Sequence, residues 1–252
     1  MRVKSLFKMH FKDARTWRYI LSSIEKVLDE GVFIASREGL KLRALDPSHV
    51  VMVDLFYPAS AFIEYEVKKD EIEIGVSFET LTKVLRRGGK EDELAIELEE
   101  NNLNISFLGR GIRKFSIPTI NLLYDKLPEP KVSFTVRAKM LSSVFRDVIK
   151  SLEKIGDSIK FKAREDVLIV IGSSDVMKGE VELSLDKQSL IEYEAESLDE
   201  SSYTLEYFTY MATASQAADI VSIQYANEAP IRVDLEYMGG GRLTFYVSPR
   251  VE

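Results

Sequence analysis

The sequence contains no cysteine and two histidines, His10 and His49. Without thiols, disulfide bonds, iron–sulfur clusters, thiol nucleophiles and zinc sites built on thiolates are excluded. A Ser-His-Asp triad would have to use one of the two imidazoles, and His10, which alternates within a short strand, is expected to be structural. Asp46 and Asp54 are too isolated to bind an ion, so we expect no metal and no cofactor.

Long apolar runs and the common catalytic motifs are also missing. No uncharged stretch is apolar enough to cross a bilayer, and the first twelve residues hold four basic side chains without the apolar core of a signal peptide. There is no G-x-S-x-G, no Walker A motif, no H-E-x-x-H and no G-x-G-x-x-G that opens a helix. These absences disfavour an enzyme. They predict a soluble, cytoplasmic protein with no membrane partner.

The composition that remains is typical of a globular chain. The 252 residues are 45% hydrophobic and 30% charged, which suits one large domain or two of medium size. Period-2 alternation of apolar and polar residues predicts strands at 71–76, 94–99, 180–185 and 231–237. Short turn signals between the runs, among them Gly239-Gly240-Gly241, favour antiparallel hairpins.

Four segments have the period of a helix instead, at about 13–28, 78–87, 138–155 and 205–218. In the first, Asp13 is placed to cap the helix, and the apolar stripe runs from Ala14 to Leu28. In the third, the expected stripe consists of Leu141, Val144, Val148, Leu152 and Ile155.

The two halves of the chain share one plan. Residues 35–40 are similar to 163–167, about 127 positions later, and 109–118 are similar to 239–249 at an offset near 130. Each half holds two units of one strand, one helix and three further strands. We therefore predict an α+β protein with two similar domains, 1–117 and 131–252. The connector between them, 118–130, has three prolines and no glycine and is expected to be stiff.

Positive charge is concentrated in the helical segments of a chain whose net charge is −7. Residues 13–28, 78–90, 138–155 and 205–218 carry +1, +3, +2 and −1, which leaves −12 elsewhere. The cations on the polar sides of these helices are Arg15, Arg18, Lys83, Arg86, Arg87, Lys139, Arg146 and Lys150. Any one helix could simply have a solvated polar face. The repetition favours a basic surface that contacts phosphates without reading sequence.

Several motifs together resemble a known family, the archaeal and eukaryotic sliding clamp proliferating cell nuclear antigen. They are Leu42–Val51 with L-R-A-L-D-P-S-H-V-V, Leu85–Gly88, Phe145–Val148, Ile155–Ile159 and Gly241–Glu252 with Y-V-S-P-R. The resemblance spans essentially the whole chain. It implies a closed ring of three identical or paralogous subunits, with four helices of each lining the hole and antiparallel sheets forming the outer wall.

The function that the resemblance implies is that of a non-catalytic processivity clamp. Such a ring encircles double-stranded DNA and tethers DNA polymerase, flap nuclease and DNA ligase, and a clamp loader is a further partner. Its DNA-facing residues would be the eight cations named above. Residues 205–218 depart from the family pattern because they contain no Lys or Arg. A damage-checkpoint clamp with other clients and a nuclease that uses Mg²⁺ and clustered carboxylates are the alternatives.

The resemblance also implies two protein-binding surfaces. A client site beneath the connector would contain Leu45, His49, Val50, Leu123, Tyr124, Leu127, Pro230, Tyr246, Val247, Ser248 and Pro249. The apolar connector residues could instead pin this segment to its own sheet, and His49 could support a turn rather than bind a client. A subunit interface would join Gly111, Ile112, Arg113, Lys114, Phe115 and Ser116 to Asp175, Lys178, Glu180 and Glu182 of the next subunit, which pairs strand edges and opposite charges.

Overall fold

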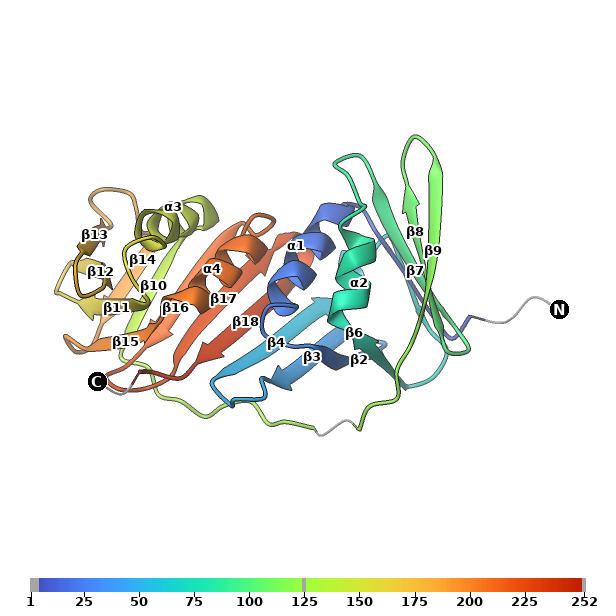
Figure 1. The fold of residues 1–252 in the computed structure, drawn as a ribbon, viewed down its shortest axis with the longest axis horizontal. Helices are drawn as coiled ribbons and strands as arrows, with labels where there is room; N and C mark the ends of the chain where they lie inside the picture. The colour runs from blue at the N-terminus through green and yellow to red at the C-terminus, as the bar shows by residue number, and fades with distance from the viewer. Residues whose placement is uncertain (1–4, 124–125, 251–252) are drawn as a thin grey trace. The chain divides into compact units, whose positions relative to one another are not determined.

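The order of strands and helices repeats between the two halves of the chain (Figure 1). The computed structural model describes residues 5–123 and 126–250. The first half contains β1 (Phe7–Phe11), α1 (Ala14–Ile24), β2 (Glu30–Ser36), β3 (Gly39–Leu45), β4 (Val51–Pro58), the short helix η1 (Ala59–Ala61), β5 (Glu64–Val67), β6 (Glu71–Ser77), α2 (Phe78–Leu85), β7 (Glu93–Glu99), β8 (Asn102–Leu108) and β9 (Ile112–Pro118). The second half contains β10 (Val136–Leu141), α3 (Ser142–Leu152), β11 (Ser158–Ala163), β12 (Val167–Ser173), β13 (Lys178–Ser184), β14 (Glu192–Ala195), β15 (Glu200–Thr204), α4 (Leu205–Ala214), β16 (Ile220–Tyr225), β17 (Ile231–Tyr237), η2 (Met238–Gly240) and β18 (Gly241–Val247).

The two halves also share the same sheet topology. In the first half the strands lie in the orders β5-β1-β7-β8-β9 and β4-β3-β2-β6, and in the second half in the orders β14-β10-β16-β17-β18 and β13-β12-β11-β15. Neighbouring strands are antiparallel, as in β1 and β7, where Phe7 lies opposite Leu98. The predicted α+β class with two similar domains is therefore confirmed. Each half adds one short strand, β5 or β14, to the predicted plan.

By contacts, the chain packs as two units that differ from its two halves. One unit is Met1–Leu45, Val53–Leu127 and Tyr237–Leu243, and the other is Asp46–Met52, Pro128–Glu236 and Thr244–Glu252. Each half thus contributes one short segment to the unit that is formed mainly by the other half. The units divide between Leu127 and Pro128, a point within the segment 118–130.

The core of the first unit is built from alternate strand positions and from α1. β1 buries Phe7, Met9 and Phe11 and leaves the residues between them partly exposed, as the period-2 alternation predicts. Trp17 of α1 is 1% exposed, and its ring centroid lies 5.1 Å from that of Tyr57. The Asp13 side chain accepts from the Arg15 N–H and caps α1, as predicted. α1 packs beside α2.

The second unit has an equivalent core. Phe161 of β11 and Phe208 of α4 are buried with ring centroids 5.4 Å apart, and Tyr225 lies 6.0 Å from Phe161. The Tyr203 hydroxyl donates to the Ala229 carbonyl at 2.9 Å, so the polar end of a buried ring is satisfied. α3 packs beside α4.

The third helix begins later than its sequence pattern predicts. Residues 138–155 were expected to be helical, but α3 spans Ser142–Leu152 because the residues before it continue β10. Leu141 precedes the helix and is 50% exposed, and Ile155 lies beyond its end and is only partly buried, so the predicted apolar stripe is wrong at its two ends, while Val144 within α3 is partly buried. The buried face consists of Phe145, Val148, Ile149 and Leu152.

The glycine run near the C-terminus forms a tight connection between β17 and β18, as predicted. Gly239 and Gly240 of η2 have φ values of 80° and 85°. This left-handed backbone region carries little cost for glycine.

Candidate functional site

Among the eight predicted DNA-facing cations, the two arginines Arg15 and Arg86 of the first helix pair are held by carboxylates of the chain itself. Arg15 Nη2 lies 2.7 Å from Asp13 Oδ2, and its Nε lies 3.1 Å from Asp13 Oδ1. The hydrogen bond to Asp13 raises the pKa of Arg15. Burial acts to raise the pKa of Asp13, but the hydrogen bonds and charge of Arg15 outweigh it and lower that pKa. Arg86 Nη2 is 2.7 Å from Glu25 Oε2.

Arg18 and Arg146 occupy equivalent positions in α1 and α3, and both hold a helix pair together. Arg18 Nη1 donates to the Gly88 carbonyl at 3.0 Å, just beyond α2. Arg146 Nη1 donates to the Ser215 carbonyl at 2.6 Å, at the C-terminal cap of α4. Carbonyls at a helix C-terminus lack intrahelical partners and carry partial negative charge. Each arginine therefore connects the first helix of a pair to the end of the second.

Lys83 and Lys150 differ from these arginines because their charges face solvent. Both are exposed, and within residues 5–123 and 126–250 neither has an ion pair or a side-chain hydrogen bond. Arg87 is also exposed, and its guanidinium carbon lies 5.5 Å from the centroid of the Phe115 ring. Of the eight cations, these three are the most available for phosphates.

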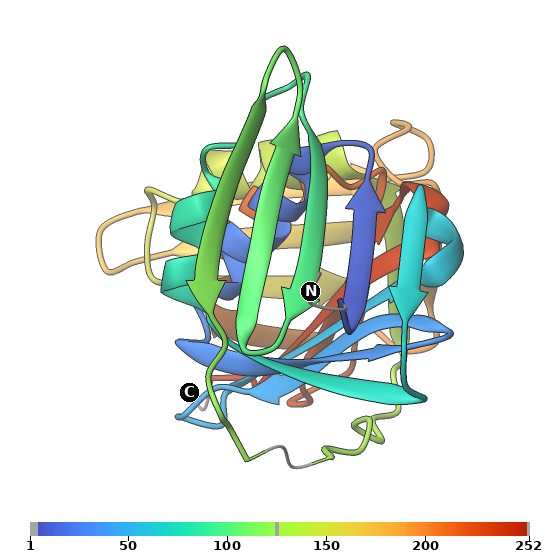
Figure 2. The ribbon, with the colours of Figure 1, turned by 90° about the vertical axis from the view of Figure 1, so that its right-hand side faces the viewer.

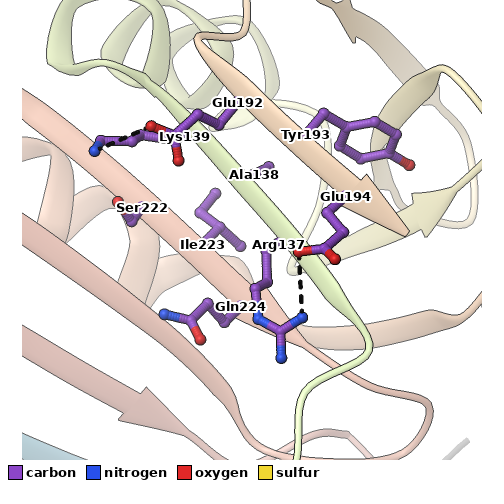
Figure 3. A pocket seen from close by; sticks show the side chains of 9 residues that line it. All are labelled: Arg137, Ala138, Lys139, Glu192, Tyr193, Glu194, Ser222, Ile223 and Gln224. Carbon is purple, nitrogen blue, oxygen red and sulfur yellow. Dashed lines mark hydrogen bonds and ion pairs between the residues drawn. The ribbon is translucent and has the colours of Figure 1, made fainter. Parts of the chain in front are cut away.

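Lys139 is not on a helix, which corrects its predicted placement. It lies on β10, where its register partners are Glu192 of β14 and Ser222 of β16, and its Nζ is 3.5 Å from Glu192 Oε1. A hollow on the surface of β10, β14 and β16 contains this ion pair (Figure 3). In it, Lys139 and Arg137 of β10 pair with Glu192 and Glu194 of β14. The Lys139 side chain thus belongs to a set of ion pairs between neighbouring strands. The helical spacing of residues 139, 143, 146 and 150 is a coincidence as far as residue 139 is concerned, because α3 begins at Ser142.

α4 carries no cation, in agreement with its sequence. Its Tyr210 occupies the position that Lys83 has in α2, and the Tyr210 hydroxyl donates to the Glu206 carboxylate one turn earlier. Burial, together with the neighbouring Glu206, raises the pKa of Tyr210 to about 12. A neutral aromatic pair, Tyr207 and Tyr210, thus stands where the other repeat has a lysine.

Asp46 organises the loop that holds the predicted client residues His49 and Val50. Its carboxylate accepts from the backbone N–H groups of Ser48, Val50 and Val51 at 2.9, 2.7 and 2.6 Å. Burial acts to raise the pKa of Asp46, but these bonds and one from the Ser48 hydroxyl outweigh it and lower that pKa. His49 has a φ of 60° and an exposed side chain. The motif is thus a loop built around one carboxylate, a role that the sequence reading did not assign to Asp46.

The C-terminal segment lies against this loop, within the second unit. The Ser248 N–H donates to the Val50 carbonyl at 2.9 Å. Of the predicted client residues here, Tyr246 is 5% exposed and Val247 is fully buried, whereas Ser248, Pro249 and Pro230 are partly exposed. Burial raises the pKa of Tyr246 to about 12. Tyr246 and Val247 therefore belong mainly to the core, and the partly exposed residues form the accessible part.

The predicted connector residues differ from one another in exposure. Leu123 is fully exposed and Leu127 is partly buried, with the Leu127 carbonyl accepting from Arg43 Nη1 at 3.2 Å. The Ile120 N–H pairs with the Gly75 carbonyl of β6 at 2.9 Å. Tyr124 lies outside the described residues. The start of the connector is thus bonded to its own sheet, while Leu123 extends into solvent.

Arg232 is a residue of this region that the sequence reading missed. It lies on β17, and Pro230 directly precedes this strand, two positions earlier. Its guanidinium carbon is 5.7 Å from the centroid of the Tyr246 ring, and its Nε donates to Asp234 Oδ2 at 2.8 Å. Burial alone would lower the pKa of Arg232, but the contact with Asp234 raises it. Arg232 lies in the predicted strand 231–237, and its closeness in sequence to Pro230 is the signal that could have revealed this arginine.

The two predicted interface segments are terminal strands of their sheets. Figure 2 faces the five-stranded sheet, with β9 (green) at one edge and β5 (cyan) at the other. On β9, Ile112 is 66% exposed. β13 ends the four-stranded sheet of the second unit, and Val176 and Met177 just before it are 93% and 54% exposed.

The charges along these edges are partly engaged within the chain. Arg113 of β9 forms an ion pair with Asp92, and its Nη1 donates to the Arg87 carbonyl at 2.9 Å. A backbone bond from Gly89, followed by the bond from Arg113, lowers the pKa of Asp92. On β13, Lys178 is 3.6 Å from Glu180, and Glu182 is 3.3 Å from Lys187. Lys114 and Asp175 are exposed, and among the described residues β9 and β13 each have a strand neighbour on one side.

The described residues contain neither a metal-binding cluster nor a membrane-spanning helix. In residues 5–123 and 126–250, no three His, Cys, Asp or Glu side chains are grouped so that they could hold a metal ion. None of the helices in this part of the chain has the length and apolar character needed to span a membrane. His10 lies on β1, with its Nε2 2.8 Å from Glu93 Oε2.

The whole chain is similar to one group of proteins. Models of the N-terminal and C-terminal domains of proliferating cell nuclear antigen match residues 6–121 and 126–250. DNA polymerase sliding clamp 3 of Aeropyrum pernix is 55% identical over 245 residues, covering 97% of this chain and 98% of that protein. The DNA polymerase sliding clamp of Pyrococcus furiosus is 34% identical, with 98% and 99% covered. A solved PCNA2–PCNA3 complex from Sulfolobus tokodaii matches with a TM-score of 0.91 at 34% identity, over 97% of this chain and 100% of that one.

Proposed function

The chain belongs to the proliferating cell nuclear antigen family, and we propose that it works as a DNA polymerase sliding clamp without catalytic activity of its own. Three subunits would form a closed ring around duplex DNA, composed of this chain alone or of this chain with similar chains. The ring would tether DNA polymerase, flap nuclease and DNA ligase, after a clamp loader has placed it on DNA.

The observation that carries this proposal is the pair of terminal strands, β9 and β13. An exposed edge strand is a template for pairing with another chain, and here each edge carries large exposed apolar residues, Ile112 on one and Val176 and Met177 on the other. Joining β9 of one subunit to β13 of the next would cover both edges at once. Because the two surfaces differ, the contact can repeat from one subunit to the next, and it would form a ring where its rotation closes after three subunits. Lys114 would add a positive charge opposite Asp175, Glu180 or Glu182.

The helix pairs would face the DNA through few cations. Lys83, Arg87 and Lys150 are exposed, whereas Arg15, Arg18, Arg86 and Arg146 are engaged within the chain. Each phosphate contact adds about −0.9 to the slope of log affinity against log salt for duplex DNA. A small number of solvated lysines therefore suits a ring that must slide, and topology rather than affinity would retain it.

Clients would bind at the surface formed by the Asp46–Val51 loop and the C-terminal segment. Val50, Pro230, Ser248 and Pro249 are partly exposed there, and we place Leu45, His49, Leu123, Tyr124 and Leu127 at the same site by resemblance. Apolar and aromatic anchors of a partner are the side chains that such a surface accepts best. Tethering on one DNA gives even a weak contact a high effective concentration.

The decisive experiment compares closed and open DNA. The chain, alone and mixed with similar clamp chains of its source genome, is loaded by the clamp loader onto nicked circular plasmid and passed through a sizing column in high salt. We expect co-elution with the circle and release when a restriction enzyme linearises the plasmid. Equal retention on linear DNA with free ends, or cleavage of the plasmid by the chain in Mg²⁺, would contradict the proposal.

A further inference from the structure

Arg232 lies at the centre of a polar network that joins three segments of the second unit. Besides its 2.8 Å bond to Asp234, its Nη1 lies 3.6 Å from Glu129 Oε1. The Tyr246 hydroxyl donates to the same Glu129 oxygen at 3.3 Å. The side chains of Arg232 and Asp234 are 18% and 7% exposed, and that of Glu129 is 52% exposed. Of these three charged side chains, that of Glu129 is therefore the most exposed to solvent.

The buried side of the network is fixed independently of Glu129. The Thr244 hydroxyl of β18 donates to Asp234 Oδ1 at 2.5 Å, so Asp234 ties β17 to β18 and holds the guanidinium in place. Asp234 and Tyr246 thus lie on two sides of Arg232, the first as an ion pair and the second as an aromatic surface. A preformed cation on strands is well suited to position an exposed carboxylate.

Glu129 is the point at which the end of the connector is attached. Between Pro128 and Ser133, all in the described part of the chain, no backbone hydrogen bond is present, and Glu129 makes the side-chain contacts. The next backbone bond is from the Thr135 N–H to the Tyr225 carbonyl at 3.1 Å. Without Glu129 the segment would have no polar attachment to β17 and β18.

This attachment lies beside the residues assigned to clients. Pro230 directly precedes β17, two residues before Arg232, and Ser248 directly follows β18, two residues after Tyr246. We propose that Arg232 and Glu129 are positioning residues of the client site, which fix the end of the connector on the β17–β18 face and so preorganise the surface that clients contact. The inference rests on the proposed clamp function. Order that exists before binding does not have to be created by the client.

The first test needs no client. Trypsin cleaves after Lys131, which is exposed and two residues beyond Glu129, and the rate of this cut reports how firmly the segment is held. We expect Glu129→Gln to accelerate cleavage at Lys131 several-fold relative to cleavage of a synthetic 127–135 peptide carrying the same substitution. Tyr246→Phe, which leaves the cleaved sequence unchanged, should accelerate it as well. Arg232→Lys retains the charge but not the separate N–H groups that contact Asp234 and Glu129, so its cleavage rate should lie between those of wild type and Glu129→Gln.

The second test measures client affinity. A synthetic peptide with one aliphatic and two adjacent aromatic residues, and no charged side chains, is titrated into wild type, Glu129→Gln, Tyr246→Phe and the double variant. Loss of one partly exposed ion pair and its hydrogen bond is expected to weaken binding about threefold. The double variant should bind no more weakly than the weaker single variant, because both substitutions break the same attachment.

The matched control is Glu192→Gln on β14, which removes another exposed carboxylate, 3.5 Å from Lys139. It should leave both the cleavage rate at Lys131 and the peptide affinity unchanged. Unaltered cleavage in Glu129→Gln and Tyr246→Phe, additive losses of affinity, or tighter peptide binding by Glu129→Gln would overturn the inference. If wild type binds no such peptide, the proposed client site fails, while the cleavage rates still decide whether Glu129 attaches the connector.

Discussion

Individual charged residues of this chain act mostly on their own fold. Arg18 and Arg146 donate to carbonyls at the C-terminal ends of neighbouring helices, and Asp46 gathers three backbone N–H groups of its loop. A count of charges along the sequence gives all of them equal weight. The side-chain contacts in the structure distinguish residues that stabilise the fold, such as Arg146, from residues that face solvent, such as Lys150.

Arg146→Met should destabilise the protein, whereas Lys150→Met should not. The methionine keeps most of the aliphatic stem but loses the 2.6 Å bond to the Ser215 carbonyl, which we expect to cost about 1 to 2 kcal/mol in the free energy of unfolding. Lys150 is exposed and one turn away on the same helix, so its substitution should remain within about 0.5 kcal/mol. Urea unfolding monitored by circular dichroism measures both. Equal stability of the two variants would show that the helix pair does not depend on Arg146.

In the Asp46→Asn variant, the free energy of unfolding should fall less steeply at acid pH than in wild type. The folded-state pKa of Asp46 lies below its ordinary value of 3.8, so the unfolded chain binds the proton more readily. The carboxylate therefore contributes stability that is fully present above 3.8 and is lost as the pH falls through the lower folded-state value. Urea midpoints recorded from neutral pH downwards should fall less steeply in Asp46→Asn than in wild type. Asp70→Asn, at a side chain that is 97% exposed, should follow the wild-type curve.

At the scale of elements, the sequence predicts types better than boundaries or neighbours. Alternation of apolar and polar residues identified β6, β7, β13 and β17, and Asp13 identified the start of α1. Both signals depend only on residues that are close together in the sequence. Lys139 was placed on α3 because helical spacing continued into β10, whose pairing with β14 and β16 depends on distant residues. The roles of Asp46 and Arg232 were missed for the same reason, since their partners are set by the turn and by a neighbouring strand.

Tyr210→Lys should make α4 resemble α2. The two residues Lys83 and Tyr210 are equivalent, and only the first carries a charge toward solvent. If both helices face DNA, the new lysine should steepen the salt dependence of DNA binding by the assembled ring, by about 0.9 in slope for each added phosphate contact. The reciprocal change, Lys83→Tyr, should flatten it. Fluorescence anisotropy with a short duplex over a salt series gives both slopes, and no change in either would remove these helices from the DNA-facing surface.

For the whole molecule, the internal repeat is what made the fold predictable from sequence. Offsets near 130 residues between similar stretches imply two domains of one plan, and the matching strand orders of the two halves bear this out. The sequence did not reveal that the packing units exchange Asp46–Met52 and Tyr237–Leu243. Such an exchange leaves no periodic signal, because it depends on which segments pack together after folding.

Ile112→Lys should convert the assembled protein into single chains of 28.7 kDa. Ile112 is 66% exposed on the terminal strand β9, so a lysine there costs little in a lone subunit, but it would place a charge in the apolar contact proposed between β9 and β13. Light scattering coupled to size exclusion should give three times the single-chain mass for the wild-type ring and the single-chain mass for the variant. Ile63→Lys should keep the wild-type mass, because this isoleucine is 57% exposed and directly precedes β5, at the opposite end of the sheet from β9. A variant ring of unchanged mass would rule out β9 as the edge through which subunits join.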